Sequence, residues 1–382
     1  MVYDFLAIVN IGLEKFAAKE ISELLNTKVY EDVGSVSFYS DLDAIFKLNI
    51  YSRTINKLIL VLGRSSFEDL NDIYKFANYI RYTDFISRDQ TFAVRVERIG
   101  KHNFTSIDAA ERIGQAIIDS YIEETGHRLK VNLDEPDVEV YSKIRDDQII
   151  IGINTTGISL HRRGYKKYKH PSALSPTIAT SMLYLANWNE EKCLVDPMCG
   201  GATIPIEAVH IKLKIPISIF RERAKIGYAF KKLKFLDIEK YEKMMEKESY
   251  YLPNENFKIV ACDISRRHIK GAKLNLSSAM VNEFVDVLIS DARNIDKIFT
   301  NFDTIVVNPP YGKRSADIRY VRKLYDTFLS SLKRCSFKNA VIITAAPKIF
   351  KSYVEKNGFS ILEERSVSHG GLIAKVFKII PA

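Results

Sequence analysis

Short apolar segments and helical segments alternate regularly in this chain from about Pro171 to its end. A strand buried on both faces reads as an unbroken apolar run, and chains that alternate such runs with helices fold as a parallel sheet covered by helices on both faces. Seven strands are predicted in this way, at residues 193–197, 258–262, 285–289, 304–307, 340–344, 361–367 and 373–379. The last two flank Ser368-His369-Gly370-Gly371, so we expect the sheet to end in an antiparallel hairpin. The connection from His210 to Phe257 is too long for one crossover and should hold inserted helices, one of them near 238–249.

The first 160 residues follow a different, mixed pattern. Residues 1–65 predict a small α+β layer, with strands at 2–9, 36–39 and 55–62 and helices at 13–25 and 41–51. Residues 66–160 predict a helix at 70–80, a strand at 91–98, a helix at 106–125 capped by Ser106, and a hairpin of strands 138–144 and 148–154. Because 382 residues exceed what one core usually supports, we expect separate domains over 1–65, 66–160 and 176–382, with 161–175 as a basic linker.

Charge is divided unequally between the two halves. Of 56 Lys+Arg and 47 Asp+Glu, residues 1–160 hold 18 and 25, which leaves 38 and 22 for the remainder. The basic excess begins abruptly at 161–170, which read His-Arg-Arg-Gly-Tyr-Lys-Lys-Tyr-Lys-His. Cations interleaved with tyrosines suit a phosphate backbone and exposed bases, although a solvated linker explains this segment equally well when it is taken alone.

A glycine turn follows the first of the seven strands. Residues 194–203 read Leu-Val-Asp-Pro-Met-Cys-Gly-Gly-Ala-Thr, where Asp196 closes the apolar run and two glycines let the backbone approach a ligand. Asp263 and Asp291 follow the next two strands, and three acids at successive strand ends suit the hydroxyls and adenine amine of a nucleoside cofactor. The fingerprint G-x-G-x-x-G is absent, which disfavours NAD and leaves S-adenosylmethionine. The predicted cofactor-binding residues are Asp196, Pro197, Gly200, Gly201, Thr203, Asp263, Ile264, Asp291, Ala292 and Asn308.

The fourth strand leads into a loop that suits an aromatic amine. Residues 305–312 read Ile-Val-Val-Asn-Pro-Pro-Tyr-Gly. The side-chain oxygen of Asn308 and the carbonyl of Pro309 can accept hydrogen bonds from an NH2 group and so free its lone pair for a methyl group, while Tyr311 offers a flat face to a base. The predicted catalytic residues are therefore Asn308, Pro309, Pro310 and Tyr311. Methylation of pyrimidine C5 would need a cysteine nucleophile, usually after proline, and no Pro-Cys pair occurs.

Several classes of protein are disfavoured by what the sequence lacks. No basic leader and no run of eighteen apolar residues occurs, so we expect a cytoplasmic protein without membrane spans. The four cysteines form neither a CxxC pair nor a Cys/His cluster, and we expect no metal. We expect a monomer.

Two further segments, together with the glycine turn and the Asn308 loop, give the chain a family resemblance over nearly its whole length. They are Phe92-Ala-Val-Arg-Val-Glu-Arg-Ile-Gly-Lys-His102 and Leu160-His-Arg-Arg-Gly-Tyr165 with His170-Pro171. The chain resembles the THUMP-domain tRNA guanine-N2 methyltransferases, particularly the type that acts at position 6 of the acceptor stem. The resemblance implies a ferredoxin-like domain, a THUMP domain that grips the tRNA 3′ end, and a Rossmann-like methyltransferase domain of class I.

The resemblance also implies roles for single residues. It implies that Gly200 and Gly201, with Asp196 and Thr203, hold the methionine moiety, and that Asp263, Asp291 and Ala292 hold the adenosine. Asn308, Pro309 and Tyr311 would hold the target base. Relatives that modify position 10 usually have Asp where this chain has Asn308.

The RNA contacts are predicted from the basic residues of the THUMP-like strand and of the junction. We expect the basic residues of the THUMP-like strand to cluster on one face. The predicted RNA-binding residues are Arg95, Arg98, Lys101, His102, Arg162, Arg163, Lys166, Lys167 and Lys169. The alternatives are the same chemistry at position 10 of tRNA, on ribosomal RNA or on adenine N6, and a THUMP-type RNA-binding protein without activity. The intact Asn308 loop argues against the last alternative.

Overall fold

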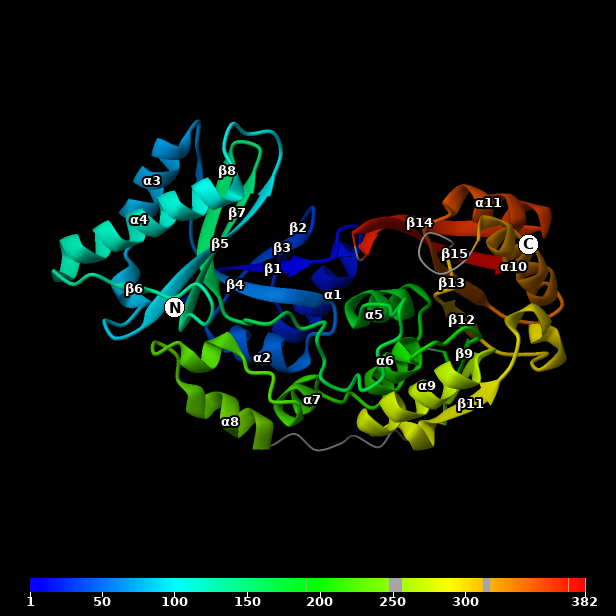
Figure 1. Ribbon diagram of the computed structural model, residues 1–382. Helices are drawn as coiled ribbons and strands as arrows, with labels where there is room; N and C mark the ends of the chain where they lie inside the picture. Colours follow the sequence, from blue (N-terminus) through cyan, green and yellow to red (C-terminus); the bar gives the residue numbers. More distant parts are fainter. Residues whose placement is uncertain (190, 247–255, 312–316, 370, 382) are drawn as a thin grey trace.

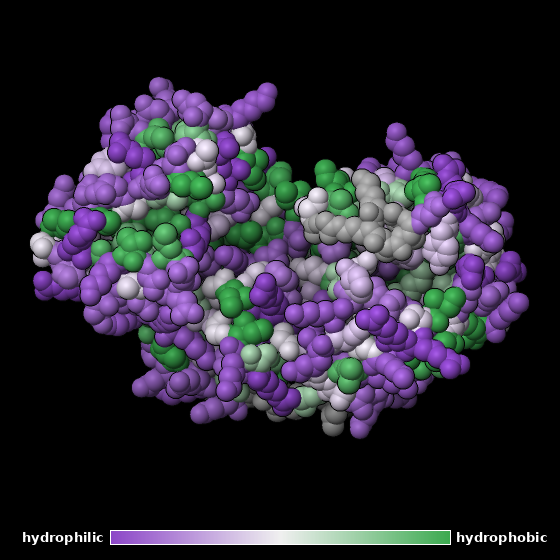
Figure 2. Space-filling model, in the orientation of Figure 1, coloured by the Kyte–Doolittle hydropathy of each residue, from purple (hydrophilic) through white to green (hydrophobic). Residues whose placement is uncertain are grey.

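The computed structural model describes residues 1–189, 191–246, 256–311, 317–369 and 371–381, and it contains two sheets that lie in two halves of the molecule (Figure 1). The surface is hollowed between these halves (Figure 2). The backbone of Gly12 approaches β14 (Phe359–His369) of the second sheet so closely that a Cβ there would lie 1.8 Å from the carbonyl oxygen of Ser366. The two halves are therefore in tight contact.

The first sheet has eight strands in the order β2-β3-β1-β4-β8-β7-β5-β6. Its strands are β1 (Tyr3–Val9), β2 (Val29–Asp32), β3 (Ser35–Ser40), β4 (Ile55–Ser66), β5 (Thr91–Ile99), β6 (Lys130–Val131), β7 (Val138–Arg145) and β8 (Gln148–Asn154). The helical elements beside it are α1 (Glu14–Leu25), α2 (Asp43–Tyr51), α3 (Leu70–Tyr79), α4 (Ser106–Thr125) and the 3-10 turn η1 (Tyr82–Asp84). The predicted boundary at 65/66 falls inside β4, and β4 pairs with β8. One sheet thus runs through both predicted N-terminal domains.

Two details of this half differ from the sequence prediction. The short strands β2 and β6 were not predicted, because neither shows a clear alternation of apolar and polar residues. The cap of α4 is Thr105 and not Ser106: the Thr105 hydroxyl accepts from the Asp108 backbone at 3.2 Å, and the Asp108 carboxylate accepts from the Thr105 backbone at 2.7 Å. This reciprocal pair is a capping box, so the helix begins one residue later than its cap.

The second sheet has the predicted number of seven strands, and their order is β11-β10-β9-β12-β13-β15-β14. The strands are β9 (Cys193–Asp196), β10 (Lys258–Asp263), β11 (Val285–Ile289), β12 (Thr304–Val307), β13 (Asn339–Thr344), β14 (Phe359–His369) and β15 (Leu372–Pro381). The first five run parallel, and β15 is antiparallel to both β13 and β14, which confirms the expected terminal antiparallel pair. Gly370 of the predicted turn lies outside the described residues.

Helices pack on both faces of this sheet and bury separate hydrophobic cores. One core takes residues from α5 (Pro176–Leu185), α6 (Thr203–Lys212) and α9 (Arg266–Ser278). The other takes residues from the 3-10 turn η4 (Ala292–Lys297), α10 (Ile318–Leu332) and α11 (Pro347–Lys356). The 3-10 turn η3 (Asn282–Phe284) precedes β11. Strand order reverses between β10-β9 and β12, and a crevice at the carboxyl ends of the strands is expected at such a point.

The predicted insertion between α6 and β10 packs against the other half of the molecule. It contains α7 (Ser218–Arg223), the 3-10 turn η2 (Ala229–Lys232) and α8 (Ile238–Glu246), and the predicted continuation to 249 lies outside the described residues. Three of its buried aromatic residues, Tyr228, Phe230 and Tyr241, belong to the core of the N-terminal sheet. Lysines of the insertion pair with acids of that half, as in Lys240–Asp43 at 2.9 Å. The insertion therefore joins the two halves and neutralises part of the N-terminal acidity.

Candidate active site

A cavity of about 470 Å³ opens at the carboxyl ends of the parallel strands, where strand order reverses. Every predicted cofactor-binding residue lines it, namely Asp196, Pro197, Gly200, Gly201, Thr203, Asp263, Ile264, Asp291, Ala292 and Asn308. Pro309 and Pro310 line it too. The structure thus brings together residues that lie up to 114 positions apart in the sequence, and the volume is typical of a small-molecule site.

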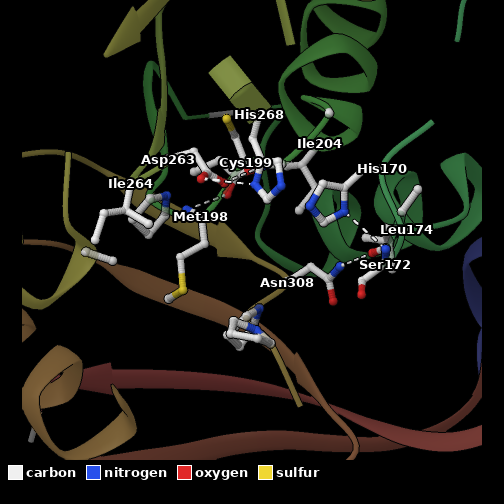
Figure 3. Close-up of a pocket in the computed structure, with 18 of the residues that line it drawn as sticks. His170, Ser172, Leu174, Met198, Cys199, Ile204, Asp263, Ile264, His268 and Asn308 are labelled. Carbon is white, nitrogen blue, oxygen red and sulfur yellow. Dashed lines mark hydrogen bonds and ion pairs between the residues drawn. The ribbon is translucent and has the colours of Figure 1, made fainter. Parts of the chain in front are cut away.

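The other side of this cavity was not predicted from the sequence. Further lining residues are His170, Pro171, Ser172, Ala173, Leu174, Met198, Cys199, Ile204, His268, Tyr320 and Leu324. Five of them are consecutive residues of the predicted linker, which therefore forms a wall of the cavity (Figure 3). The sequence feature that could have predicted this wall is His170-Pro171. Its position between a basic run and a helix gave no indication of a pocket.

Asp263 holds the glycine turn in place. Its Oδ2 accepts a hydrogen bond from the backbone of Gly200 at 3.0 Å, and its Oδ1 accepts from the backbone of Ser265 at 2.8 Å. Gly200 has a φ of +54°, in the left-handed region that favours glycine. The ring of His268 lies 3.3 Å from the carboxylate and meets that of His170 at 4.4 Å between centroids (Figure 3). Asp263 therefore organises the turn as well as lining the cavity.

Asp196 is buried with little compensation. Its carboxylate accepts one long hydrogen bond, from the Met198 backbone at 3.3 Å, and no ion pair to it occurs within the described part of the chain. Burial raises the pKa of this carboxyl well above its usual range, and the nearby charge of Asp263 acts in the same direction. A buried carboxylate in this condition is stabilised by a cationic or hydrogen-bond-donating ligand.

Asp291 already has a strong partner. It caps η4 and accepts from Arg293, whose Nη2 lies 2.6 Å from Oδ2. This hydrogen-bonded contact lowers the pKa of Asp291. The carboxylate oxygens keep further lone pairs, so a ligand donor can still bind beside the guanidinium.

The Asn308 loop is oriented by the junction segment. The Asn308 Nδ2 donates to the carbonyl oxygen of Ser172 at 3.2 Å, which directs Oδ1 to the other side (Figure 3). The Tyr311 hydroxyl donates to this Oδ1. Burial raises the pKa of Tyr311. Tyr311 is not among the residues that line the cavity, so its stacking on a base stays a prediction. The predicted extra charge of Gly312-Lys313-Arg314 lies outside the described residues.

The structure contradicts one predicted RNA contact in the junction, Arg163, and partly buries a second, Lys166, because both side chains point inward. Arg163 is 2% exposed, lies 3.3 Å from Glu207 and donates to the carbonyl oxygen of Leu160 at 2.9 Å. Lys166 donates to the carbonyl oxygen of Leu174 at 2.9 Å, and burial lowers its pKa to about 8. The remaining predicted junction contacts are exposed, namely Arg162, Lys167 and Lys169.

The predicted THUMP contacts do not share one face. Arg95 and Arg98 are three residues apart on the regular strand β5, so their side chains project to opposite faces of the sheet. The Arg95 guanidinium donates to the carbonyl oxygen of Leu133, whereas Arg98 lies 2.9 Å from the ring of His102. Lys101 is exposed. The expected clustering is therefore wrong for the two arginines, and Arg98, Lys101 and His102 gather at the end of β5.

Among the residues that the structure describes, no group of three or more His, Cys, Asp or Glu side chains could hold a metal ion. None of the helices in that part of the chain combines the length and the apolar character that crossing a membrane requires.

Three segments of the chain match described families. Residues 4–59 match an RlmL ferredoxin-like domain, residues 67–154 a THUMP domain and residues 163–375 an RMKL-like methyltransferase domain. A tRNA (guanine(6)-N2)-methyltransferase of Methanocaldococcus jannaschii is 41% identical over 98% of this chain and 99% of its own length. The enzyme of the same name from Archaeoglobus fulgidus is 36% identical over 98% of this chain and 92% of its own. Among solved structures, a protein of Clostridium difficile 630 described as a possible methylase has a TM-score of 0.87 at 25% identity, covering 100% of this chain and 98% of that one.

Proposed function

The chain belongs to the RMKL-like methyltransferase family, and from that premise we propose that it transfers a methyl group from S-adenosylmethionine to the exocyclic N2 amine of a guanosine in tRNA, at position 6 of the acceptor stem. Two archaeal relatives that carry this activity in their names align with 98% of this chain. The observation that carries the proposal is that the three strand-end acids and Asn308 line one cavity.

The residues of the cavity fit the cofactor. S-adenosylmethionine supplies an electrophilic methyl group and carries a cationic amino group, ribose hydroxyls and an adenine amine. Asp196, buried with a single backbone donor, suits the amino group, and Gly200 and Gly201 allow close approach of the backbone. Asp263 suits the ribose hydroxyls, and Asp291 with Ala292 the adenine. The protein SMU.472, which has a similar fold, was crystallised in complex with SAH.

Asn308 orients the target amine. Its Nδ2 is engaged by the Ser172 carbonyl, so Oδ1 is the atom that accepts from the guanine N2 amine, together with the Pro309 carbonyl. These acceptors favour a pyramidal nitrogen whose lone pair points to the methyl donor. The Tyr311 hydroxyl holds the same Oδ1 and turns away or shares it when the base enters. The proton is lost to solvent after the methyl group has been transferred, so no strong base is needed.

The N-terminal half holds the RNA. The exposed cations at the end of β5 and in the junction, among them Lys101, Arg162, Lys167 and Lys169, contact phosphates and position the acceptor stem. A single chain carries a complete cavity, which supports a monomer, and a tRNA substrate supports a cytoplasmic location.

Ribosomal RNA is the second candidate substrate. A ribosomal RNA large subunit methyltransferase K/L of Colwellia psychrerythraea is 26% identical over 93% of this chain, but the chain covers 51% of that protein. Mass spectrometry of nucleosides from bulk tRNA and from ribosomal RNA, each incubated with labelled S-adenosylmethionine, tests the proposal. We expect labelled N2-methylguanosine in tRNA, at position 6 by fragment mapping. Label only in ribosomal RNA, or in N6-methyladenosine, would contradict the proposal.

A further inference from the structure

Six exposed cations lie on α9 and on the junction segment packed against it, beside the cavity, and we call this surface the α9 strip. It is formed by the exposed side chains of Lys167, Lys169, Arg266, Arg267, Lys270 and Lys273. Helix α9 reads Arg-Arg-His-Ile-Lys-Gly-Ala-Lys-Leu-Asn-Leu-Ser-Ser and contains no acid. An ordinary solvated helix mixes both signs of charge, so a helix whose exposed charges are all positive suggests an anionic partner.

The junction segment is fixed onto this helix by specific contacts. The Asn275 Oδ1 accepts hydrogen bonds from the backbones of Lys167 and Tyr168, both at 2.8 Å, and its Nδ2 donates to the carbonyl oxygen of Tyr168 at 3.1 Å. The Tyr168 ring covers Gly271 so closely that a Cβ there would lie 2.2 Å from the ring. The junction segment that carries Lys167 and Lys169 is therefore held against α9.

None of the six cations takes part in an ion pair among the residues that the structure describes. The insertion offers the opposite case, because its Lys231, Lys232, Lys234 and Lys240 each pair with a carboxylate. Arg266 and Arg267 also occupy the first turn of α9, where the helix dipole disfavours cations. The arrangement lowers stability unless an anion binds to it.

The strip begins at the rim of the cavity. Ile264 and His268, which flank its first two arginines, line the cavity, and so does His170, which follows Lys169. From Arg266 to Lys273 the helix rises by roughly 10 Å, enough to meet about three phosphates of one strand. Figure 1 shows α9 on the outer surface of the second half, where a long polymer has access.

We propose that the α9 strip binds the phosphate backbone of the RNA substrate next to the nucleotide that enters the cavity. The inference rests on the proposed function and adds to it a contact surface on the methyltransferase domain itself, in a helix separate from the THUMP domain. Such contacts position the RNA and carry no sequence information.

The test compares two triple variants of the full chain. One is Arg266→Gln, Lys270→Gln, Lys273→Gln on α9. The matched control is Lys297→Gln, Lys333→Gln, Lys348→Gln, which removes the same charge from exposed residues on the opposite face of the sheet. For each protein, tRNA affinity is measured over a series of salt concentrations, together with KM for tRNA, kcat and S-adenosylmethionine affinity.

We expect the α9 variant to bind tRNA more weakly, with the slope of log K against log salt reduced by roughly 0.9 for each duplex phosphate that the variant no longer neutralises. KM for tRNA should rise while kcat at saturating tRNA and cofactor affinity stay close to the parent. The control should match the parent. If the α9 variant and the control bind tRNA equally, with equal salt slopes, the α9 assignment is overturned while the proposed function stands. A parent chain that methylates no RNA would overturn the proposed function and the α9 assignment with it.

Discussion

Glu207 and Asp196 are two buried carboxylates of the same half, and they differ in what their surroundings give them. Glu207 accepts from the Tyr165 hydroxyl at 2.8 Å and the Thr180 hydroxyl at 3.1 Å, and it forms an ion pair with Arg163 at 3.3 Å. Burial alone would raise its pKa, but neighbouring cations, Arg163 above all, hold it at about 2. Asp196 has one backbone donor, and burial raises its pKa. A buried charge that its own protein satisfies stabilises the fold, and one left with a single weak donor marks a ligand site.

The largest expected effect separates these two roles at Glu207. Glu207→Gln leaves Arg163 buried without its counter-charge, which should lower the free energy of unfolding by roughly 3–5 kcal/mol. The folded fraction should keep its affinity for S-adenosylmethionine, because Glu207 does not line the cavity. Denaturant unfolding and calorimetry measure the two quantities.

The double variant Glu207→Gln with Arg163→Met is the control for the Glu207 variant. Removing both charges should cost less stability than removing one. A single variant that unfolds like the parent would show that Glu207 does not compensate the buried charge of Arg163. The sign of the pH effect follows from the pKa: the stability from Glu207 is present above pH 4.5 and is lost as pH falls toward about 2.

The next largest effect concerns Asn308, which lines the cavity. Asn308→Ala should reduce kcat by about 10²–10³ because one positioned acceptor for the amine is removed. Cofactor affinity should change little, since Asn308 acts on the base. Single-turnover methylation of tRNA and calorimetry measure these. Abolished cofactor binding would show that Asn308 belongs to the cofactor site and not to the base.

The sequence predicted residues that come to line one cavity, but it did not predict the buried network, for a physical reason. Asp196, Asp263 and Asp291 stand at strand ends, and parallel strands bring their carboxyl ends to one edge of a sheet, so topology alone places these residues together. Whether a charge such as Arg163 is buried depends on a partner 44 residues away inside a helix, which no local pattern shows. The same limit explains why the docking of the insertion on the first sheet and the cavity wall 170–174 were missed.

Asp263 combines features of Glu207 and Asp196, since it accepts hydrogen bonds from two backbone groups and also lines the cavity. Asp263→Ala should weaken S-adenosylmethionine binding by roughly 10-fold to 150-fold, as expected for hydrogen bonds of about 1.5–3 kcal/mol to a charged group. Rates at saturating cofactor should fall less, because the amine is oriented elsewhere. Calorimetric titration is the measurement, and parent-like affinity would remove Asp263 from the ribose.

The smallest expected effect is a pH dependence that belongs to Asp196. Because its pKa is raised, Asp196 stays protonated in a fraction of the unliganded molecules at pH values where an ordinary carboxyl is ionised. A cationic amino group binds the ionised form. Affinity for S-adenosylmethionine should therefore rise with pH, by up to about tenfold per unit below that pKa, and then level off, with release of a proton on binding.

Asp263, His170 and His268 line the same cavity, so Asp196→Asn serves to isolate the contribution of Asp196. It should flatten the profile without lowering stability at neutral pH, because a carboxyl with a raised pKa destabilises the unliganded fold as pH rises through that pKa. Titrations at several pH values, in two buffers of different ionisation enthalpy, measure both quantities. Equal profiles for parent and variant would show that the pH dependence does not come from Asp196 and would remove the distinction between Asp196 and Glu207.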